Sequence, residues 1–250
     1  MFGVHHRANP STNARHAVLL CYPGVQEYNG AHWLFRRLAG MLQRAGHDVL
    51  RFDYHATGDS EGNGADGRPT IWTENVGEAA AELRELAGVR TLSIVGMRLG
   101  AALALKACTQ DLRVRTLVLW EPVVLGADYL SELEDLDRRR NLALLHADRP
   151  PGARDELLGH PLPPGHRREL LEVNACGLPR PQAERVVIVA EETREPYARL
   201  RESLESHGVP TALKLVKDEN VAQDGNQRER ARLGHAVLVE IVSQLGNEAH

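Results

Sequence analysis

The chain has 250 residues, enough to bury a substantial core in one large α/β domain or in two small ones. Its formal net charge of −4 gives no support for a nucleic-acid or polyanion-binding protein. Residues 1–10 lack the apolar segment of a signal peptide, and no apolar run approaches the length of a membrane span. Three widely spaced cysteines form neither a disulfide framework nor a C-x-x-C metal pair, so a soluble cytoplasmic protein is expected.

In chain order, apolar strand-like runs alternate with helix-like patterns. Strands are predicted at 16–23, 48–54, 91–96, 114–122, 185–191 and 211–217. Helices are predicted at 31–46, 74–88, 101–110, 197–208 and near 227–245. This alternation predicts an α/β fold with a mostly parallel central sheet and helices on both faces. Functional side chains are expected just after the carboxyl ends of the strands.

Residues 123–182 interrupt the alternation, because they are rich in charge, proline and histidine and contain only short helical pieces. Placed over the strand ends, such an insertion would form a cap or lid on a core made of residues 1–122 and 183–250. The alternative is a solvated helical excursion without a function of its own.

The stretch "SIVGMRLGAALAL" at 93–105 predicts a buried strand, a tight turn and a helix. In that setting a G-x-S-x-G turn is typical of a serine hydrolase. Here Arg98 stands between Gly96 and Gly100, and a guanidinium stays protonated and cannot act as an acyl nucleophile.

Several stretches together resemble the α/β-hydrolase superfamily. "RFDYHATGDSEG" (51–62) is similar to its D-Y-R-G-x-G-x-S turn, with His55 and Ala56 in place of arginine and glycine. "VGMRLGA" (95–101) resembles the elbow, and "LVLWEPVV" resembles the strand that follows. The resemblance is closest to the serine-aminopeptidase-like branch, including the exosortase-associated hydrolase-like proteins. "CYPGVQEY" (21–28) is similar to a C-x-P-x-x-x-E-Y stretch in relatives that carry a V-G-L-R-L-G-A elbow.

The resemblance implies an α/β-hydrolase fold, to which the topology adds a helical cap, and it also locates the positions of a catalytic triad. The nucleophile position is Arg98, and Glu191 or Glu192 follows the penultimate strand at the acid position. The loop at 217–227, where the histidine belongs, contains none, and His235 lies further on in the last helical pattern. Two of three triad members are therefore missing, which argues against ordinary serine hydrolysis.

Arg98 has two interpretations at this position. A guanidinium at the start of a helix would bind a carboxylate or phosphate well. Alternatively, it is paired with an acid of the chain itself, such as Glu27 or Glu121, and fills the vacated site. Met97, Tyr28 and Glu121 are further candidates for substrate binding beside it.

Cys21 is the candidate for a relocated nucleophile, because it ends the first core strand and a nearby arginine would lower its pKa. The alternative is a buried cysteine that acts as a small hydrophobe. Glu27, in the loop expected after this strand, is a candidate general base or partner of Arg98, or else a surface acid. His32, expected to open the first helix, is a candidate substitute base, or else faces solvent.

No metal or cofactor is expected. The twelve histidines show neither H-x-x-x-H nor H-E-x-x-H spacing, and no G-x-G-x-x-G follows a strand. Asp53 and Ser60 are expected to hold their turn by hydrogen bonds to the backbone, while Gly58 supplies an unusual φ. These residues therefore have structural roles.

Three classes of function remain. The favoured one is a non-standard enzyme that acts on an acyl, thioester or carboxylate-bearing small molecule, free or carrier-linked, through Arg98, Cys21 and Glu27. The second is an inactive pseudohydrolase that binds an anionic ligand. The third is an interaction protein whose cap recognises a partner, and a pocket closed by an Arg98–Glu27 or Arg98–Glu121 pair would favour it.

Overall fold

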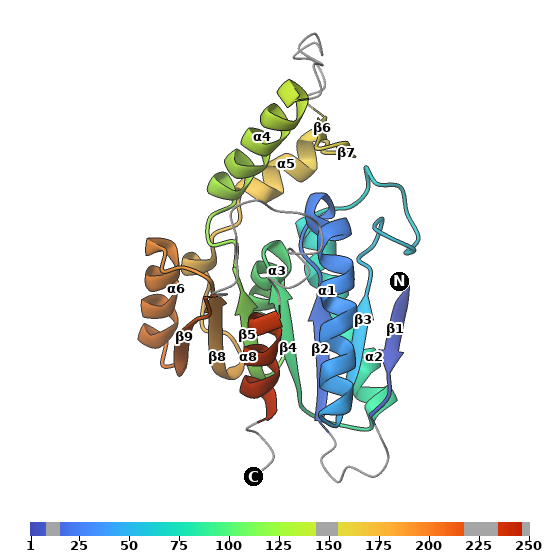
Figure 1. Cartoon of the computed structure of the whole chain (residues 1–250), viewed down its shortest axis with the longest axis vertical. Coiled ribbons are helices and arrows are strands. Elements are labelled where there is room, and N and C mark those ends of the chain that lie inside the picture. Colours follow the sequence, from blue (N-terminus) through green and yellow to red (C-terminus); the bar gives the residue numbers. More distant parts are fainter. Residues whose placement is uncertain (9–15, 144–154, 218–234, 247–250) are drawn as a thin grey trace.

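The computed structural model of the chain describes residues 1–8, 16–143, 155–217 and 235–246. Its centre is a seven-stranded sheet in the order β1-β3-β2-β4-β5-β8-β9 (Figure 1). The strands are β1 (Gly3–His6), β2 (His16–Cys21), β3 (His47–Phe52), β4 (Leu92–Met97), β5 (Val114–Trp120), β8 (Ala183–Ala190) and β9 (Thr211–Leu215). All neighbouring strands are parallel except β1, which pairs antiparallel with β3. The predicted mostly parallel sheet is confirmed, whereas β1 was not predicted.

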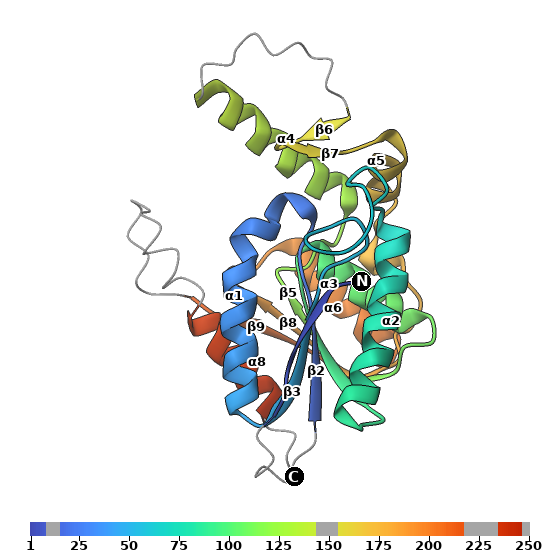
Figure 2. The ribbon, with the colours of Figure 1, turned by 90° about the vertical axis from the view of Figure 1, so that its right-hand side faces the viewer.

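Helices cover both faces of the sheet. Their bounds are α1 (Val25–Arg44), α2 (Pro69–Ala87), α3 (Leu99–Thr109), α6 (Glu195–Ser206) and α8 (His235–Gly246). Helices α1 and α8 lie on one face, and α2 and α3 lie on the other (Figure 2). Among the described residues, no helix is both long enough and apolar enough to span a membrane.

Two helices begin five or six residues earlier than the sequence patterns predict. Helix α1 begins at Val25 instead of residue 31, and α2 begins at Pro69 instead of residue 74. Glu27 and Tyr28 therefore lie on the first turn of α1 and not in a loop, and His32 lies one turn further along instead of opening the helix. This correction matters for the site, because a helix directs successive side chains about 100° apart.

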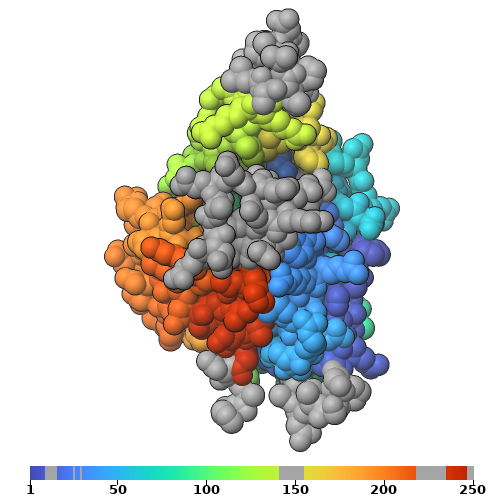
Figure 3. Space-filling view, viewed as in Figure 1, coloured from blue at the N-terminus to red at the C-terminus, as the bar shows by residue number. Residues whose placement is uncertain are grey.

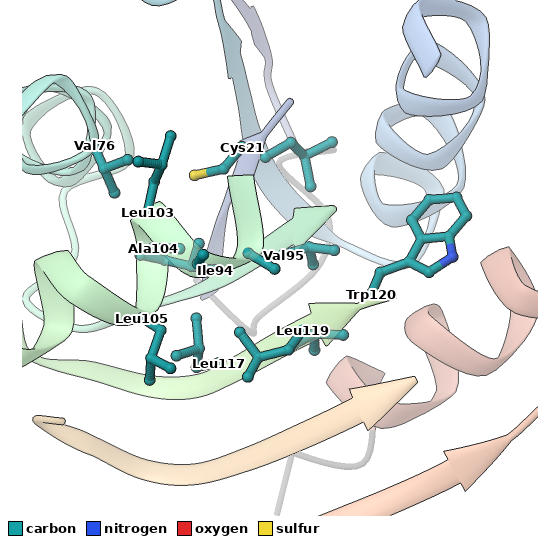
Figure 4. Close-up of a cluster of buried hydrophobic side chains, with 14 of the residues drawn as sticks. Cys21, Val76, Ile94, Val95, Leu103, Ala104, Leu105, Leu117, Leu119 and Trp120 are labelled. Carbon is teal, nitrogen blue, oxygen red and sulfur yellow. The ribbon is translucent and has the colours of Figure 1, made fainter. Parts of the chain in front are cut away.

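The central strands are buried on both sides by apolar side chains. Every residue of β2 is buried, and so is every residue of β4 except Met97. Figure 4 shows the side chain of Cys21 directed toward Val76 and Leu103, on the side of α2 and α3. Burial of such continuous apolar runs is what a parallel sheet covered on both faces requires.

Between β5 and β8, the described residues 126–143 and 155–173 rise above the carboxyl ends of the strands. They form α4 (Gly126–Ala143), the short hairpin β6 (Glu156–Leu157) and β7 (His160–Pro161), and α5 (Pro164–Leu171), which stand over the core (Figures 1 and 3). An antiparallel bridge between Leu125 and Asn174 closes the base of this excursion. We call the described residues 126–143 and 155–173 the cap segment. The short 3₁₀ turn η1 (Ala175–Gly177) that follows it lies against α3 and α6, in the core.

Candidate functional site

The turn between β4 and α3 has the sharp geometry of a strand-to-helix elbow. Arg98 adopts φ 52° and ψ −119°, a strained conformation for a residue with a side chain. Its backbone nitrogen donates to the Trp120 carbonyl oxygen at 2.9 Å. A Cβ on Gly100 would lie 2.1 Å from the Tyr22 carbonyl oxygen, and one on Gly96 would lie 2.6 Å from the Cα atom of Ala101. Both glycines are therefore required for the close approach of β2, β4 and α3.

Arg98 is held by two carboxylates and an aromatic ring. Its Nε donates to Glu27 Oε1 at 3.0 Å, and its Nη2 donates to Glu132 Oε2 at 2.6 Å. The guanidinium carbon lies 5.5 Å from the centre of the Tyr129 ring, and the Tyr129 hydroxyl donates to Glu27 Oε2 at 2.8 Å. Glu132 and Tyr129 come from α4, so these four residues, the elbow cluster, join the elbow, α1 and the cap segment.

Electrostatics in the elbow cluster keep the arginine charged. Burial disfavours the charged guanidinium, but Glu27 and Glu132 together raise the pKa of Arg98 above its ordinary value. Burial and the neighbouring Glu27 carboxylate raise the pKa of Tyr129, so its hydroxyl remains a hydrogen-bond donor. Of the two expected interpretations of Arg98, the observed contacts match the one in which an acid of the chain is its partner.

Glu121 has a different role from the one considered beside Arg98. Its Oε1 accepts from the Glu191 backbone nitrogen at 2.7 Å, and its Oε2 accepts from the Tyr197 hydroxyl at 2.6 Å. Glu121 thus ties the end of β5 to the end of β8 and to α6. Arg98 is paired with Glu27 and Glu132 and not with Glu121.

The environment of Cys21 corrects the expectation of a thiolate. Its side chain is fully buried, and it lies among apolar neighbours such as Val76 and Leu103 (Figure 4). Burial raises the pKa of the Cys21 thiol well above its ordinary value, and the hydroxyl of Tyr54 only partly opposes this effect. The guanidinium of Arg98, which was expected to lower this pKa, is occupied by Glu27 and Glu132. Cys21 therefore has the environment of a small buried hydrophobe.

Three further candidates do not join the elbow cluster. The Tyr28 hydroxyl donates to Asp53 Oδ1 at 2.7 Å, beside the end of β3. His32 is exposed, and its ring lies 6.1 Å from the ring of Tyr22 in a parallel arrangement. It lines a cavity with Tyr22 and Tyr28 and is not among the residues that line the hollow beside Arg98. Met97 packs against the hydrophobic core.

The turn at 53–60 is built as its sequence predicts. The Ser60 hydroxyl donates to the Asp53 carbonyl oxygen at 2.6 Å, and Asp53 Oδ2 accepts from the Asp59 backbone nitrogen at 2.9 Å. Gly58 has φ 52°, as expected, and Ala56 has φ 59°. Ala56 stands where the resembling motif has glycine, so this chain strains its backbone at a point where glycine would relax it.

A small hollow of about 80 Å³ opens beside Arg98. Its walls are partly apolar and partly charged: Pro122, Val123, Val124, Leu125, Asp128, Tyr129, Glu132, Arg194, Pro196 and Tyr197. The sequence did not single out Tyr129, Glu132 or Arg194 as site residues. The sequence indicates that Tyr129 and Glu132, three residues apart, share one face of a helix. Nothing in the sequence indicates that this face contacts Arg98.

The structure describes the acid position of the triad but only one residue of the loop expected to carry the histidine. Glu191 and Glu192 are exposed just after β8. The expected histidine loop at 217–227 lies, apart from residue 217, outside the described residues. His235 begins α8, and its Nδ1 lies 2.9 Å from Arg37 Nη2. Arg37 is ten residues beyond Glu27 on α1, about 15 Å along a helix that rises 1.5 Å per residue. Within the described ranges, no cluster of three or more histidine, cysteine, aspartate or glutamate residues is placed to hold a metal ion.

Comparison with known proteins supports the fold but not a family. No family model matches the sequence, and no curated protein matches it. Among solved structures, a monoglyceride lipase from Saccharomyces cerevisiae has a TM-score of 0.65 at 13% identity, covering 98% of this chain and 89% of that one. Alpha/beta hydrolase domain-containing protein 10 from mouse has a TM-score of 0.60 at 15% identity, covering 98% and 93%. A structure described under the metagenome-derived lipolytic enzymes LipS and LipT has a TM-score of 0.63 at 19% identity, covering 98% and 97%. The chain therefore has the α/β-hydrolase fold.

Proposed function

We propose that this chain is a non-hydrolytic member of the α/β-hydrolase fold that binds an anionic acyl compound at Arg98. The observation that carries the proposal is the guanidinium at the elbow, bonded to Glu27 and Glu132 where a nucleophilic serine would otherwise stand. This is the pseudohydrolase alternative and not the enzyme favoured on sequence alone. The Arg98–Glu27 pair is the contact expected of the third class, an interaction protein, but the second partner of Arg98, Glu132, has a side chain that is 56% exposed and that a ligand can displace.

The chemistry of the elbow supports binding over acyl transfer. A guanidinium offers only donors and no lone pair for attack on a carbonyl carbon. The thiol of Cys21 has a raised pKa and no exposed surface, so it offers no ready substitute nucleophile. By contrast, Arg98 at the start of α3 is well suited to hold a carboxylate through paired hydrogen bonds.

The unequal exposure of the two acids suggests how a ligand enters. The side chain of Glu27 is 25% exposed, that of Arg98 is 11% exposed, and that of Glu132 is 56% exposed. Glu132 is therefore the partner that a ligand carboxylate displaces at the lowest desolvation cost. The acyl tail would then contact Val123, Val124 and Leu125, which already line the hollow.

In this proposal the cap segment controls access to the site. Glu132 lies on α4, so its displacement from Arg98 would release one contact between the cap segment and the elbow. The cap segment would then cover a core formed by residues 1–122 and 183–250, and the cap would be shorter than the expected 123–182 because η1 lies in the core. The hollow of about 80 Å³ is smaller than the 300–1,000 Å³ typical of ligand sites, which is consistent with a closed state.

Calorimetric titration with octanoate, beside neutral octanol as a matched ligand, tests the proposal. We expect wild-type protein to bind octanoate at least about tenfold more tightly than octanol, which corresponds to about 1.4 kcal/mol. Arg98→Gln should abolish this preference. Arg199→Gln, which removes the same charge from an exposed position on α6, should keep it.

Hydrolysis of p-nitrophenyl octanoate by the same proteins provides the second measurement. We expect no turnover above the uncatalysed rate in any of them. If the wild-type protein hydrolyses the ester and Arg98→Gln does not, the protein is an enzyme instead. If the wild-type protein binds octanoate and octanol with equal affinity, the elbow cluster has only a structural role. Each of these two results would overturn the proposal.

A further inference from the structure

A second cavity, larger than the hollow at the elbow, lies beside the edge of the sheet. It has a volume of about 350 Å³ and is bounded by β1, the end of β3, the first half of α1 and the turn at 53–59. We call it the edge cavity. Its polar lining includes His6, Tyr22, Arg36, Arg51, Asp53 and Asp59. This volume lies within the range typical of small-molecule sites.

Arg51 is the central group of the edge cavity. It lies on β3 and is only 7% exposed, although a guanidinium is always charged. Its Nη1 donates to the Tyr22 hydroxyl at 2.8 Å, and its Nε donates to His6 Nε2 at 3.0 Å. Both partners are neutral acceptors. Within the described part of the chain, no carboxylate lies within 4.0 Å of this guanidinium.

Arg51 differs from Arg98 in lacking a carboxylate partner among the described residues. Arg98, at a similar depth, has two carboxylate partners at 3.0 and 2.6 Å, as a buried cation normally requires. Asp53 lines the same cavity as Arg51, but its Oδ1 accepts from Tyr28 and its Oδ2 accepts from the Asp59 backbone nitrogen. Arg51 thus presents a positive charge to a cavity without a directly bonded counter-ion among the described residues.

Two further features point to an anion. Arg36 contributes a second guanidinium to the cavity wall from α1. Burial lowers the pKa of His6, and the charges of Arg51 and Arg36 lower it further, so His6 stays neutral and accepts from Arg51. A bound oxyanion would neutralise these guanidinium groups, which share the cavity wall with the carboxylates of Asp53 and Asp59.

We propose that the edge cavity is a second anion-binding site, in which Arg51 binds the carboxylate or phosphate group of a small polar ligand. The remaining nitrogen of the guanidinium, Nη2, would donate to the oxyanion, and Arg36 would contribute a charge at the rim. Asp59, an exposed carboxylate of the cavity wall, would favour a ligand that also carries a hydroxyl or ammonium group.

Calorimetric titration with inorganic phosphate and, separately, with acetate at constant ionic strength tests the site. We expect saturable binding of at least one of them in the millimolar range or tighter. Tighter binding of phosphate would identify a phosphorylated ligand, and tighter binding of acetate would identify a carboxylate. Arg51→Gln should weaken the binding at least about tenfold, because it removes the charge-assisted hydrogen bonds.

Two variants on α1 keep the test decisive if Arg51→Gln fails to fold. Arg36→Gln removes a charge from the cavity wall, whereas Arg44→Gln removes the same charge from the exposed last turn of the same helix. We expect Arg36→Gln to weaken binding several-fold and Arg44→Gln to leave it unchanged. No saturable binding of either anion to the wild-type protein would overturn the proposal. The proposal would also be overturned if Arg36→Gln, and every Arg51 variant that folds, bound the anions as tightly as Arg44→Gln does.

Discussion

At the scale of single residues, the elbow cluster has one partly buried acid and one exposed acid on the same guanidinium. Glu27 is also bonded to the Tyr129 hydroxyl, which fixes its carboxylate in place. Glu132 is more than half exposed, so water competes for its bond to Arg98. The two ion pairs have similar distances, but they should differ in energy because the dielectric environment differs.

Double-mutant cycles should reveal this difference. We expect a coupling of about 1–3 kcal/mol between Arg98→Gln and Glu27→Gln, because each single change leaves a partly buried charge unpaired. The coupling between Arg98→Gln and Glu132→Gln should stay below about 1 kcal/mol, as for exposed pairs. Urea unfolding of the two single variants and the double variant in each cycle measures both energies. Equal couplings, or a larger coupling for Glu132, would show that burial does not decide the strength of these pairs.

The sequence predicted that Arg98 would sit at an elbow with an acid as one possible partner, but it did not distinguish Glu27 from Glu121. Each residue lies within six residues of the end of a central strand, so the pattern made both of them candidates. Two tertiary facts decide between them. The early start of α1 brings Glu27 to the guanidinium, and the Glu191 backbone nitrogen and Tyr197 already occupy Glu121. Neither fact leaves a local signal in the sequence.

At the scale of elements, strands were predicted more accurately than helix starts. Continuous apolar runs specify buried parallel strands, whereas α1 begins after Gly24, which has no side chain to mark the N-cap. Pro69 does indicate the start of α2 in the sequence, because proline favours the first helical turn. Strand β1 was missed because four residues with two histidines show no clear alternation, and its pairing with β3 alone makes it a strand.

The base of the cap segment depends on a glycine. Gly126 begins α4, and its backbone nitrogen donates to the Val173 carbonyl oxygen at 2.8 Å. A Cβ at this position would lie 1.6 Å from the Leu170 carbonyl oxygen, which belongs to α5. No side chain can therefore be accommodated unless α4 and α5 separate.

Gly126→Ala should accordingly destabilise the protein by about 2 kcal/mol or more, in the range of overpacked cores. Gly165→Ala is the matched control, because it lies in α5 and a Cβ there meets nothing within 4 Å. We expect the control to be neutral or to stabilise the protein by up to about 1 kcal/mol through helix propensity. Thermal unfolding monitored by circular dichroism distinguishes the two, and similar midpoints for both variants would contradict the close approach at the base of the cap segment.

At the scale of the whole molecule, the cap segment is attached to the core on two sides. On one side, α4 reaches the elbow cluster. On the other side, Glu169 of α5 accepts from the Thr70 backbone nitrogen at 3.0 Å, at the start of α2 where no side chain of α2 itself caps the helix. Beside this contact, the buried ring of His166 packs edge-on against Trp72, with ring centres 5.0 Å apart. The joint between α5 and α2 therefore contains a titratable group out of reach of water.

This joint should make the stability of the protein sensitive to acid. Burial lowers the pKa of His166 from 6.5 to about 4. Between these values the unfolded chain binds a proton that the folded chain excludes, so the contribution of His166 to stability is complete above about pH 6.5 and is lost as the pH falls toward 4. The largest loss is about 3 kcal/mol, from 1.36 kcal/mol for each pKa unit.

Urea unfolding at pH 7.5 and at pH 4.5 measures this dependence. We expect His166→Gln to be less stable than the wild-type protein at pH 7.5, because it loses the contact with Trp72, but to lose about 2 kcal/mol less on acidification. His207→Gln, at the exposed end of α6, should lose as much stability as the wild-type protein. The histidines common to all three proteins, including His6 with its lowered pKa, cancel in the comparison. If the wild-type protein and His166→Gln lose the same stability between pH 7.5 and pH 4.5, His166 is protonated in the folded state. Water would then have to reach the contact between α5 and α2.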